Sequence, residues 1–199
     1  MTASEILTIG HSNHPIETFL TLLRDNRVEG VVDTRSYPNS KFAPQYGADE
    51  LRRVLHQQGI EYIPMGSDLG GRPEGSQFYD GEGHVLYARV AEAPFFLAGV
   101  ERLEKDIRRL RLALLCSEAN PSICHRHLLI SRVLRQRGIS VSHIRADGTL
   151  QSEDELCAAE DALSSAGPQI PLFEYTKAPE WKSIPSVSRK RAPRNSSAY

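Results

Sequence analysis

Cysteine is scarce in this sequence, and its scarcity excludes one class of fold. The chain has 199 residues and only three cysteines, Cys116, Cys124 and Cys157. A small, odd number of cysteines in a chain of this length is not the disulfide framework of a small secreted domain, and it fits a reducing compartment. We therefore expect a cytoplasmic protein.

Long apolar runs and a leader sequence are also missing. No stretch reaches the roughly 20 apolar residues that a transmembrane helix needs, and residues 1–10, which include Glu5, do not form a basic and then apolar leader. The sequence thus predicts that the protein has no membrane partner. Its 40% of apolar residues suffice for the core of one globular domain.

A large net charge is absent as well, but the charge is unevenly distributed. The formal net charge is -1, yet residues 177–199 contain six Lys and Arg residues against Glu180 alone. This Pro- and Ser-rich segment cannot bury enough apolar surface to order itself, although Trp181 could dock. We expect an ordered domain over residues 1–176 and a basic, disordered tail over residues 177–199. Weak contact of the tail with nucleic acid is the functional alternative.

Short apolar runs alternate with helical patterns along the domain. Five runs bounded by turn residues are typical of buried strands, and they cover residues 6–10, 28–32, 60–65, 112–115 and 139–144. Apolar residues at helical spacing predict helices over about 14–26, 48–58, 87–109, 122–137 and 152–163, the third broken at Pro94. The alternation predicts a single α/β domain with a mostly parallel five-stranded sheet and helices on both faces.

Unusual residues follow each of the predicted strands. Ligands of such sheets bind beyond the carboxyl ends of the strands, so we expect these residues to converge on one rim. They are His11 and Ser12, Asp33 and Arg35, Gly70 and Gly71 in a long loop, Cys116 and Glu118, and Arg145 and Asp147.

The richest chemistry lies between the fourth strand and the next helix. We predict that Ser122 is the helix N-cap, which places Cys124, His125 and Arg126 in the first helical turn. Free backbone N–H groups and the positive end of the helix dipole favour an anion there. Together with Arg35, Arg126 offers the bidentate geometry that phosphate accepts. The alternative is that the two arginines only form ion pairs with the neighbouring carboxylates.

The same residues suggest several chemical roles. Cys116 is a candidate nucleophile, because an arginine and a helix N-terminus lower a thiol pKa, although it could also be a packed thiol. Glu118 and Asp33 are candidate general acids or bases, and His11 is a candidate base near neutral pH. A cysteine-dependent phosphatase would require arginine where this chain has Ser122. The candidate ligand-binding residues are Ser12, Arg35, Ser40, Gly70, Gly71, Cys124, His125 and Arg126.

A metal site is a further alternative. Cys116, Cys124 and His125 are ligand types that suit zinc. However, the spacing of the cysteines is not that of a C-x-x-C knuckle. We therefore assign no metal and no cofactor from the sequence.

Several of these motifs occur together in a known family. The chain contains Thr8-Ile9-Gly10-His11-Ser12, Asp33-Thr34-Arg35 with Pro38 and Ser40, Leu69-Gly70-Gly71, Leu114-Leu115-Cys116-Ser117-Glu118 with Cys124-His125-Arg126, and His143-Ile144 with Asp147-Gly148. In order and spacing it resembles the prokaryotic domain-of-unknown-function family 488 over about residues 5–150. The resemblance implies an α/β domain of unestablished activity that is suspected of acting on nucleic acid or nucleotides. One departure is that Thr149 to Ser152 lacks the histidine that follows the Asp-Gly pair in many members.

We thus predict an anion pocket at the carboxyl rim of the sheet. The protein would be an enzyme acting on a phosphate-bearing small molecule, a nucleotide or nucleic acid, with no assigned reaction class. The alternatives are a non-catalytic ligand- or nucleic-acid-binding module and a Cys/His metal site.

Overall fold

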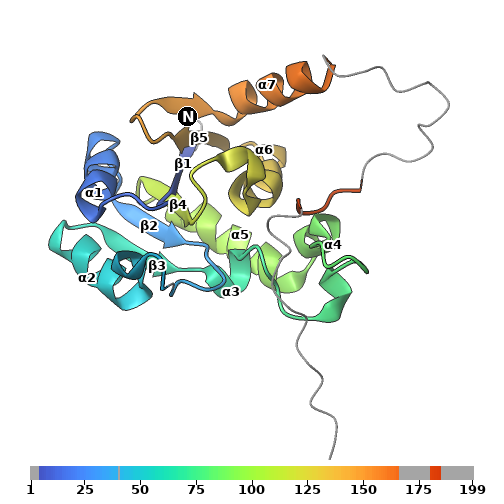
Figure 1. Cartoon of the computed structure of the whole chain (residues 1–199), viewed down its shortest axis with the longest axis horizontal. Coiled ribbons are helices and arrows are strands. Elements are labelled where there is room, and N and C mark those ends of the chain that lie inside the picture. Colours follow the sequence, from blue (N-terminus) through green and yellow to red (C-terminus); the bar gives the residue numbers. More distant parts are fainter. Residues whose placement is uncertain (1–4, 40, 166–179, 185–199) are drawn as a thin grey trace, which may run out of the picture.

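The computed structural model describes residues 5–39, 41–165 and 180–184. Within them the chain forms one six-stranded sheet of order β3-β2-β4-β1-β5-β6 (Figure 1). The strands are β1 (Glu5–Gly10), β2 (Gly30–Asp33), β3 (Glu61–Pro64), β4 (Leu112–Cys116), β5 (Ser140–Ile144) and β6 (Leu150–Ser152). The pairings among β1 to β5 are parallel, whereas β6 is antiparallel to β5. The predicted single, mostly parallel sheet is confirmed, with one strand more than the five we expected.

The additional strand follows a tight turn at the end of β5. The backbone N–H of Arg145 binds the carbonyl of Thr149, and the Asp147 carboxylate accepts the backbone N–H and the hydroxyl of Thr149. These groups therefore build the turn into β6. Because β6 has only three residues, all half-buried or exposed, it lacks the apolar run that indicated the other strands.

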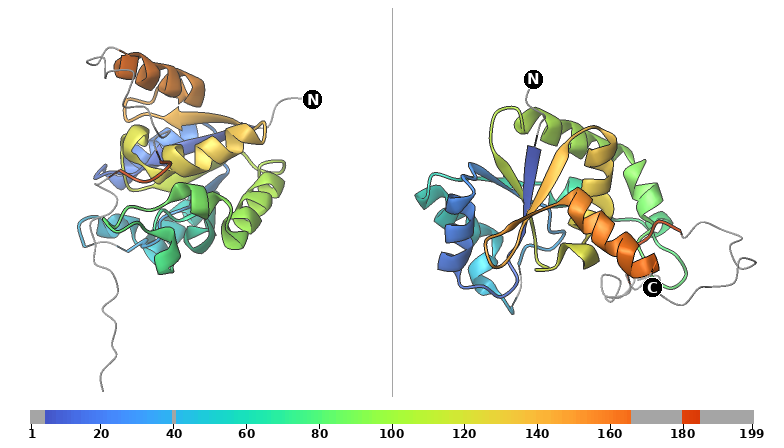
Figure 2. Two further views of the ribbon diagram at one scale, coloured as in Figure 1. Left: turned by 90° about the vertical axis from the view of Figure 1, so that its right-hand side faces the viewer. Right: turned by 90° about the horizontal axis from the view of Figure 1, so that it is seen from above.

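Helices cover both faces of the sheet (Figure 2). The α-helices are α1 (Ile16–Asp25), α2 (Ala48–Gln57), α3 (Gly66–Leu69), α4 (Tyr87–Ala91), α5 (Pro94–Asp106), α6 (Arg132–Gln136) and α7 (Glu153–Ser165). Three 3-10 turns, η1 (Pro44–Tyr46), η2 (Ser76–Phe78) and η3 (Pro121–Ile123), and the π-helix η4 (Arg126–Ser131) complete the described elements. The predicted break at Pro94 is confirmed, because α5 begins there with proline in its first turn. None of the helices among the described residues is long and apolar enough to cross a membrane.

Alternate residues of the strands supply two separate cores. Leu7 and Leu115 pack with the apolar residues of α1 and α2 on one face. Ile6 and Leu114 pack with residues of α4, α5, η4 and α6 on the other. This period of two explains why the central strands are apolar without alternation: both faces of the sheet are covered.

The strand register brings three strand ends to one edge of the sheet. Gly10 lies opposite Cys116, and the N–H of His11 binds the carbonyl of Cys116 at 3.0 Å. In β2, Asp33 lies opposite Leu115, and the N–H of Thr34 binds the carbonyl of that residue. Side chains that follow β1, β2 and β4 are therefore neighbours, as predicted from a parallel sheet.

A short piece of the predicted tail lies against the domain. Lys182 forms an antiparallel bridge with Leu86, and the N–H of Ser183 binds the carbonyl of Val85. The indole N–H of Trp181 donates to the carbonyl of Leu128 in η4 at 2.6 Å. The expectation that Trp181 docks is thus confirmed. Residues 166–179 and 185–199, where the rest of the tail and the end of the predicted domain fall, lie outside the described residues.

Candidate functional site

The site is built where β4 ends at the rim. Four buried apolar residues lead to Cys116, and the chain then turns over β1. A Cβ atom on Gly10 would lie 1.8 Å from the carbonyl oxygen of Glu118. Only glycine therefore lets the chain cross the end of β1 closely enough to hold Glu118 beside Cys116.

The start of the following helix differs from the prediction. The side chain of Asn120, not Ser122, is the cap: it accepts the N–H of Ser122 at 3.2 Å and begins the 3-10 turn η3. Cys124 is extended, and η4 starts at Arg126 as a π-helix, in which the Ser131 hydroxyl donates to the Arg126 carbonyl. The prediction of Ser122 as N-cap is wrong, because an asparagine preceding proline supplied a better cap.

Three backbone N–H groups at this helix start are already occupied. The N–H of Arg126 points to Cys124 Sγ at 3.5 Å, and those of His127 and Leu128 bind the carbonyl of Cys124. At these three positions the expected free N–H groups for an anion are therefore not found. Instead, this segment brings reactive side chains close together.

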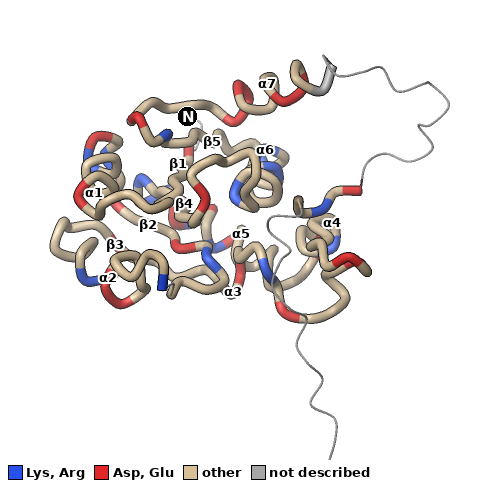
Figure 3. The backbone as a smooth tube through the Cα atoms, viewed as in Figure 1, with Lys and Arg blue, Asp and Glu red and all other residues tan. Residues whose placement is uncertain are grey.

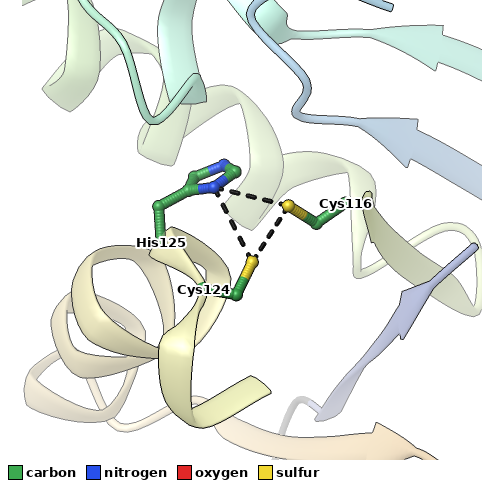
Figure 4. A group of neighbouring side chains, drawn as sticks. All are labelled: Cys116, Cys124 and His125. Carbon is green, nitrogen blue, oxygen red and sulfur yellow. Dashed lines mark hydrogen bonds between the residues drawn. The ribbon is translucent and has the colours of Figure 1, made fainter. Parts of the chain in front are cut away.

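The two cysteines and the histidine meet in the interior (Figure 4). We call Cys116, Cys124 and His125 the Cys–His cluster. The two Sγ atoms are 2.9 Å apart, and His125 Nδ1 lies 3.5 Å from Cys116 Sγ and 3.8 Å from Cys124 Sγ. Glu118 Oε2 is 2.6 Å from Cys116 Sγ and 3.4 Å from Cys124 Sγ. All three residues of the cluster are buried, whereas Glu118 is partly exposed.

The neighbours of Cys116 favour its thiolate. Burial alone would raise the pKa of Cys116, but the hydrogen bond from Cys124 and the positive charges of His125 and Arg126 hold that pKa well below its usual range. Burial and the neighbouring Cys116 raise the pKa of Cys124 well above its usual range, so this thiol keeps its proton. Burial and then the charge of Cys116 raise the pKa of Glu118. Burial would lower the pKa of His125, but the charge of Cys116 outweighs it and raises that pKa.

Arg126 supplies a buried positive charge. Its side chain is fully buried, and Nη2 donates to the carbonyl of Ala119 at 2.7 Å. Nε and Nη1 have no hydrogen-bond partner, and no ion pair joins Arg126 to Glu118, within the ranges that the structure describes. A buried guanidinium needs a negative charge nearby. The Cys116 thiolate meets this need.

Two further buried polar atoms beside the cluster lack a partner among the described residues. They are His125 Nε2 and the hydroxyl of Tyr87. Burial, and then the nearby Cys124, Cys116 and Glu118, raise the pKa of Tyr87. We did not predict Tyr87, because in the sequence it is only one of the apolar residues of a helix start.

A second network lies next to the cluster. Arg35 forms a two-point ion pair with Asp33 through Nε (2.8 Å) and Nη2 (2.6 Å), and its Nη1 donates to His11 Nε2 at 3.2 Å. The hydroxyl of Tyr62 donates to Asp33 Oδ2 at 2.7 Å, and the His11 ring stacks on Tyr46. For Arg35 the ion-pair alternative is therefore observed. Burial and then the charge of Arg35 lower the pKa of His11 to about 4, so His11 is neutral near pH 7.

An open hollow borders this second network. It encloses about 340 Å³, and its lining includes Arg35, Ser36, Tyr62, Gly66 and Ser67. We call it the Arg35 hollow. His11 connects this hollow to the Cys–His cluster, because its ring bonds to Arg35 and its backbone N–H bonds to the carbonyl of Cys116.

The predicted glycine pair packs around the site. A Cβ atom on Gly71 would lie 2.7 Å from Cγ of the His125 ring, and one on Gly70 would lie 2.4 Å from the hydroxyl oxygen of Ser36. Both glycines thus let the long loop approach the site closely. Ser12, with a φ of 48°, donates its N–H to the carbonyl of Ser117 at the rim. Ser40 lies outside the described residues.

The Cys–His cluster could also hold a metal ion. The two Sγ atoms and one ring nitrogen of His125 all lie within 4.8 Å of one another. Two thiolates and an imidazole are a donor set that zinc accepts, with a fourth position left for another ligand.

Comparison with known proteins gives a family and no activity. The sequence profile of a family described as Domain of unknown function DUF488 matches residues 15–133. No curated protein and no solved structure matches the chain.

Proposed function

The chain belongs to the DUF488 family, and from the site's geometry we propose that it is an enzyme whose nucleophile is the Cys116 thiolate. One observation carries the proposal: Cys116 Sγ lies 3.5 Å from His125 Nδ1, near the buried guanidinium of Arg126, whose Nε and Nη1 have no partner among the described residues. A thiolate next to an imidazolium and an arginine is the reactive form of cysteine.

The surrounding groups divide the work of such a reaction. His125 and Arg126 stabilise the negative charge on sulfur, and Glu118 is placed to exchange a proton with a reacting group because its carboxylate is partly exposed. The N–H groups on Nε and Nη1 of Arg126 and the hydroxyl of Tyr87, which have no partner in the part of the chain that the structure describes, are donors that can stabilise negative charge developing in the transition state.

For the substrate we propose a phosphate-bearing ligand bound in the Arg35 hollow. Its volume of about 340 Å³ falls in the usual range for small-molecule sites. Ser36, whose hydroxyl oxygen accepts the N–H of Arg72, offers a hydroxyl donor in its wall. Tyr37, the next residue in the chain, is 71% exposed and offers a stacking surface for a base. Because Asp33 neutralises Arg35, the hollow would select by hydrogen bonds and shape more than by net charge.

The basic residues at α6 argue for a nucleotide as the ligand rather than an extended nucleic acid. Lys and Arg residues gather at α6 (Figure 3). Arg135 pairs with Asp154 and Arg137 with Glu104, and the guanidinium of Arg132 lies over the ring of Trp181. These charges are engaged within the chain, so they give little support to binding along a phosphate backbone.

The test is the rate of alkylation of Cys116 by iodoacetamide, measured by peptide mass spectrometry from pH 5 to 9 with and without phosphate and nucleotides. We expect Cys116 to react below pH 7, and Arg126→Gln to slow it. Cys157, whose pKa is raised by burial, serves as the internal control and should react only at higher pH. A nucleotide in the hollow should protect Cys116. Equal reaction rates of the two cysteines across this range would contradict the proposal.

A metal site is the second candidate, because three donor atoms converge in the Cys–His cluster. Metal analysis of untagged protein as purified separates the two. About one zinc or iron ion per chain, with Cys116 protected from alkylation until a chelator is added, would establish the metal site. Absence of metal together with rapid alkylation of Cys116 would establish the thiolate.

A further inference from the structure

The Cys–His cluster contains one thiol more than a nucleophile requires. Cys116 and Cys124 are both free and buried, and they are eight positions apart in the chain. Their Sγ atoms are 2.9 Å apart, less than 1 Å beyond the roughly 2.05 Å of a disulfide bond. The third cysteine, Cys157, is in α7 and contacts Arg135 and Glu153 instead.

From this distance we propose that Cys116 and Cys124 form a reversible disulfide that switches the site off. The inference rests on the proposed function, because the switch acts by removing the Cys116 thiolate. It adds a regulatory role for Cys124 to the hydrogen bond by which this residue stabilises the Cys116 thiolate.

The oxidant we propose is a hydroperoxide. The Cys116 thiolate attacks one peroxide oxygen, the O–O bond breaks, and hydroxide or an alkoxide leaves, so that Cys116 becomes a sulfenic acid. The Cys124 sulfur then attacks the sulfenic sulfur, forming the S–S bond. The hydroxyl of the sulfenic acid leaves as water, taking up the proton of Cys124. Glu118 Oε2, 3.4 Å from Cys124 Sγ and 2.6 Å from Cys116 Sγ, is placed to carry that proton from Cys124 Sγ to the hydroxyl oxygen that leaves Cys116.

The surroundings suit both states of the pair. Cys124 and His125 lie between η3 and η4 and Cys116 at the end of β4, so the bond would join two segments that are already in contact. In the disulfide state Arg126 loses the thiolate charge and Glu118 becomes the nearest available anion, while a dithiol that reduces the bond restores the thiolate. Among the described residues Cys157 has no second cysteine beside it and contacts Arg135 and Glu153 instead. It is therefore a matched control.

The experiment treats the reduced full-length chain with hydrogen peroxide and measures the intact mass and the non-reduced peptide map. We expect the loss of two hydrogen atoms, a crosslinked peptide containing Cys116 and Cys124, and complete loss of Cys116 alkylation, all reversed by dithiothreitol. Cys157→Ser should behave in the same way. Cys124→Ser should gain oxygen at Cys116 and form no intramolecular crosslink.

Oxygen addition at Cys116 of the wild-type chain without a crosslink would overturn the switch. So would a crosslink that involves Cys157. Neither result touches the nucleophile, because its alkylation is measured on reduced protein before peroxide is added. Conversely, slow alkylation of Cys116 in the reduced protein at neutral pH would contradict the proposed function, even if peroxide then produces a disulfide. The peptide map of the wild-type chain decides the matter without relying on the folding of any variant.

Discussion

At the scale of single residues, Gly71 fixes the position of the His125 ring. A Cβ atom at this position would lie 2.7 Å from Cγ and 2.9 Å from Nδ1 of the ring. In Gly71→Ala the ring or the loop must therefore move, and overpacking of this kind costs about 1–3 kcal/mol of unfolding free energy. Because Nδ1 faces Cys116, we also expect slower alkylation of Cys116 at neutral pH.

Gly81 provides the control for this prediction. It lies in the same loop, and a Cβ atom there would meet nothing within 4 Å. Urea denaturation and the alkylation rate should both distinguish the two alanine variants, with Gly81→Ala within about 0.5 kcal/mol of the wild type. If the two variants behave alike, the close packing of Gly71 on the ring has no consequence for the site.

The residues of the site were predictable in part. Cys116, Glu118, Cys124 and His125 stood out because polar and reactive side chains at the end of an apolar strand have no packing reason to be there. Tyr87 did not stand out, because its single polar atom becomes informative only when the fold leaves that atom buried without a partner. Sequence alone therefore singled out the Cys–His cluster, Glu118 and Arg126, and missed Tyr87.

At the scale of elements, one buried carboxylate ties four of them together. Glu153 at the start of α7 accepts from His127 of η4 at 2.8 Å and from His143 of β5 at 2.7 Å, and His143 in turn bonds to Thr8 of β1. Burial would raise the pKa of Glu153, but the hydrogen bonds from His127 and His143 outweigh it and lower that pKa to about 2. The carboxylate is thus charged and fully engaged at neutral pH.

We expect Glu153→Gln to destabilise the protein by about 2–4 kcal/mol, because it breaks a buried charge network and leaves His127 without its main partner. Glu160 is the matched control: it bonds to the same histidine at 3.2 Å, but its side chain is 37% exposed. Glu160→Gln should cost less than about 1 kcal/mol. Both free energies come from urea denaturation at pH 7, and equal effects of the two variants would contradict the role assigned to burial.

The elements themselves were predictable to different degrees, for physical reasons. The five predicted strands and the break at Pro94 follow from apolar runs and from the geometry of proline, both of which are local. The start of α7 is also set locally, because Ser152 and Glu155 form a capping box in which each side chain bonds to the other's N–H group. The start of η4 was not predictable, because it depends on the cap from Asn120 and on the hydrogen bond from Ser131 to the Arg126 carbonyl.

At the scale of the whole molecule, the fold buries several histidines in opposite protonation states. Burial lowers the pKa values of His11 and His143, so these rings are neutral at pH 7. For His127, burial opposes protonation, but the hydrogen bond and charge of Glu153 outweigh it and raise that pKa. Stability from a raised pKa is lost as the pH rises through it, whereas a lowered histidine pKa costs stability as the pH falls below about 6.5. The molecule should therefore be most stable near neutral pH.

The share of His11 in this pH dependence can be measured separately. Its pKa is about 4 in the folded chain against about 6.5 when unfolded, so between pH 7 and pH 5 the folded state should lose about 2 kcal/mol through this group. His11→Gln should reduce the fall in unfolding free energy over that range by about this amount, whatever its effect at pH 7. His56→Gln, an exposed position on α2, should leave the slope unchanged. Carboxylates with ordinary pKa values titrate mostly below pH 5 and contribute little to the pH dependence over this range. An equal slope of the unfolding free energy in His11→Gln and the wild type would therefore mean that His11 is not held neutral beside Arg35.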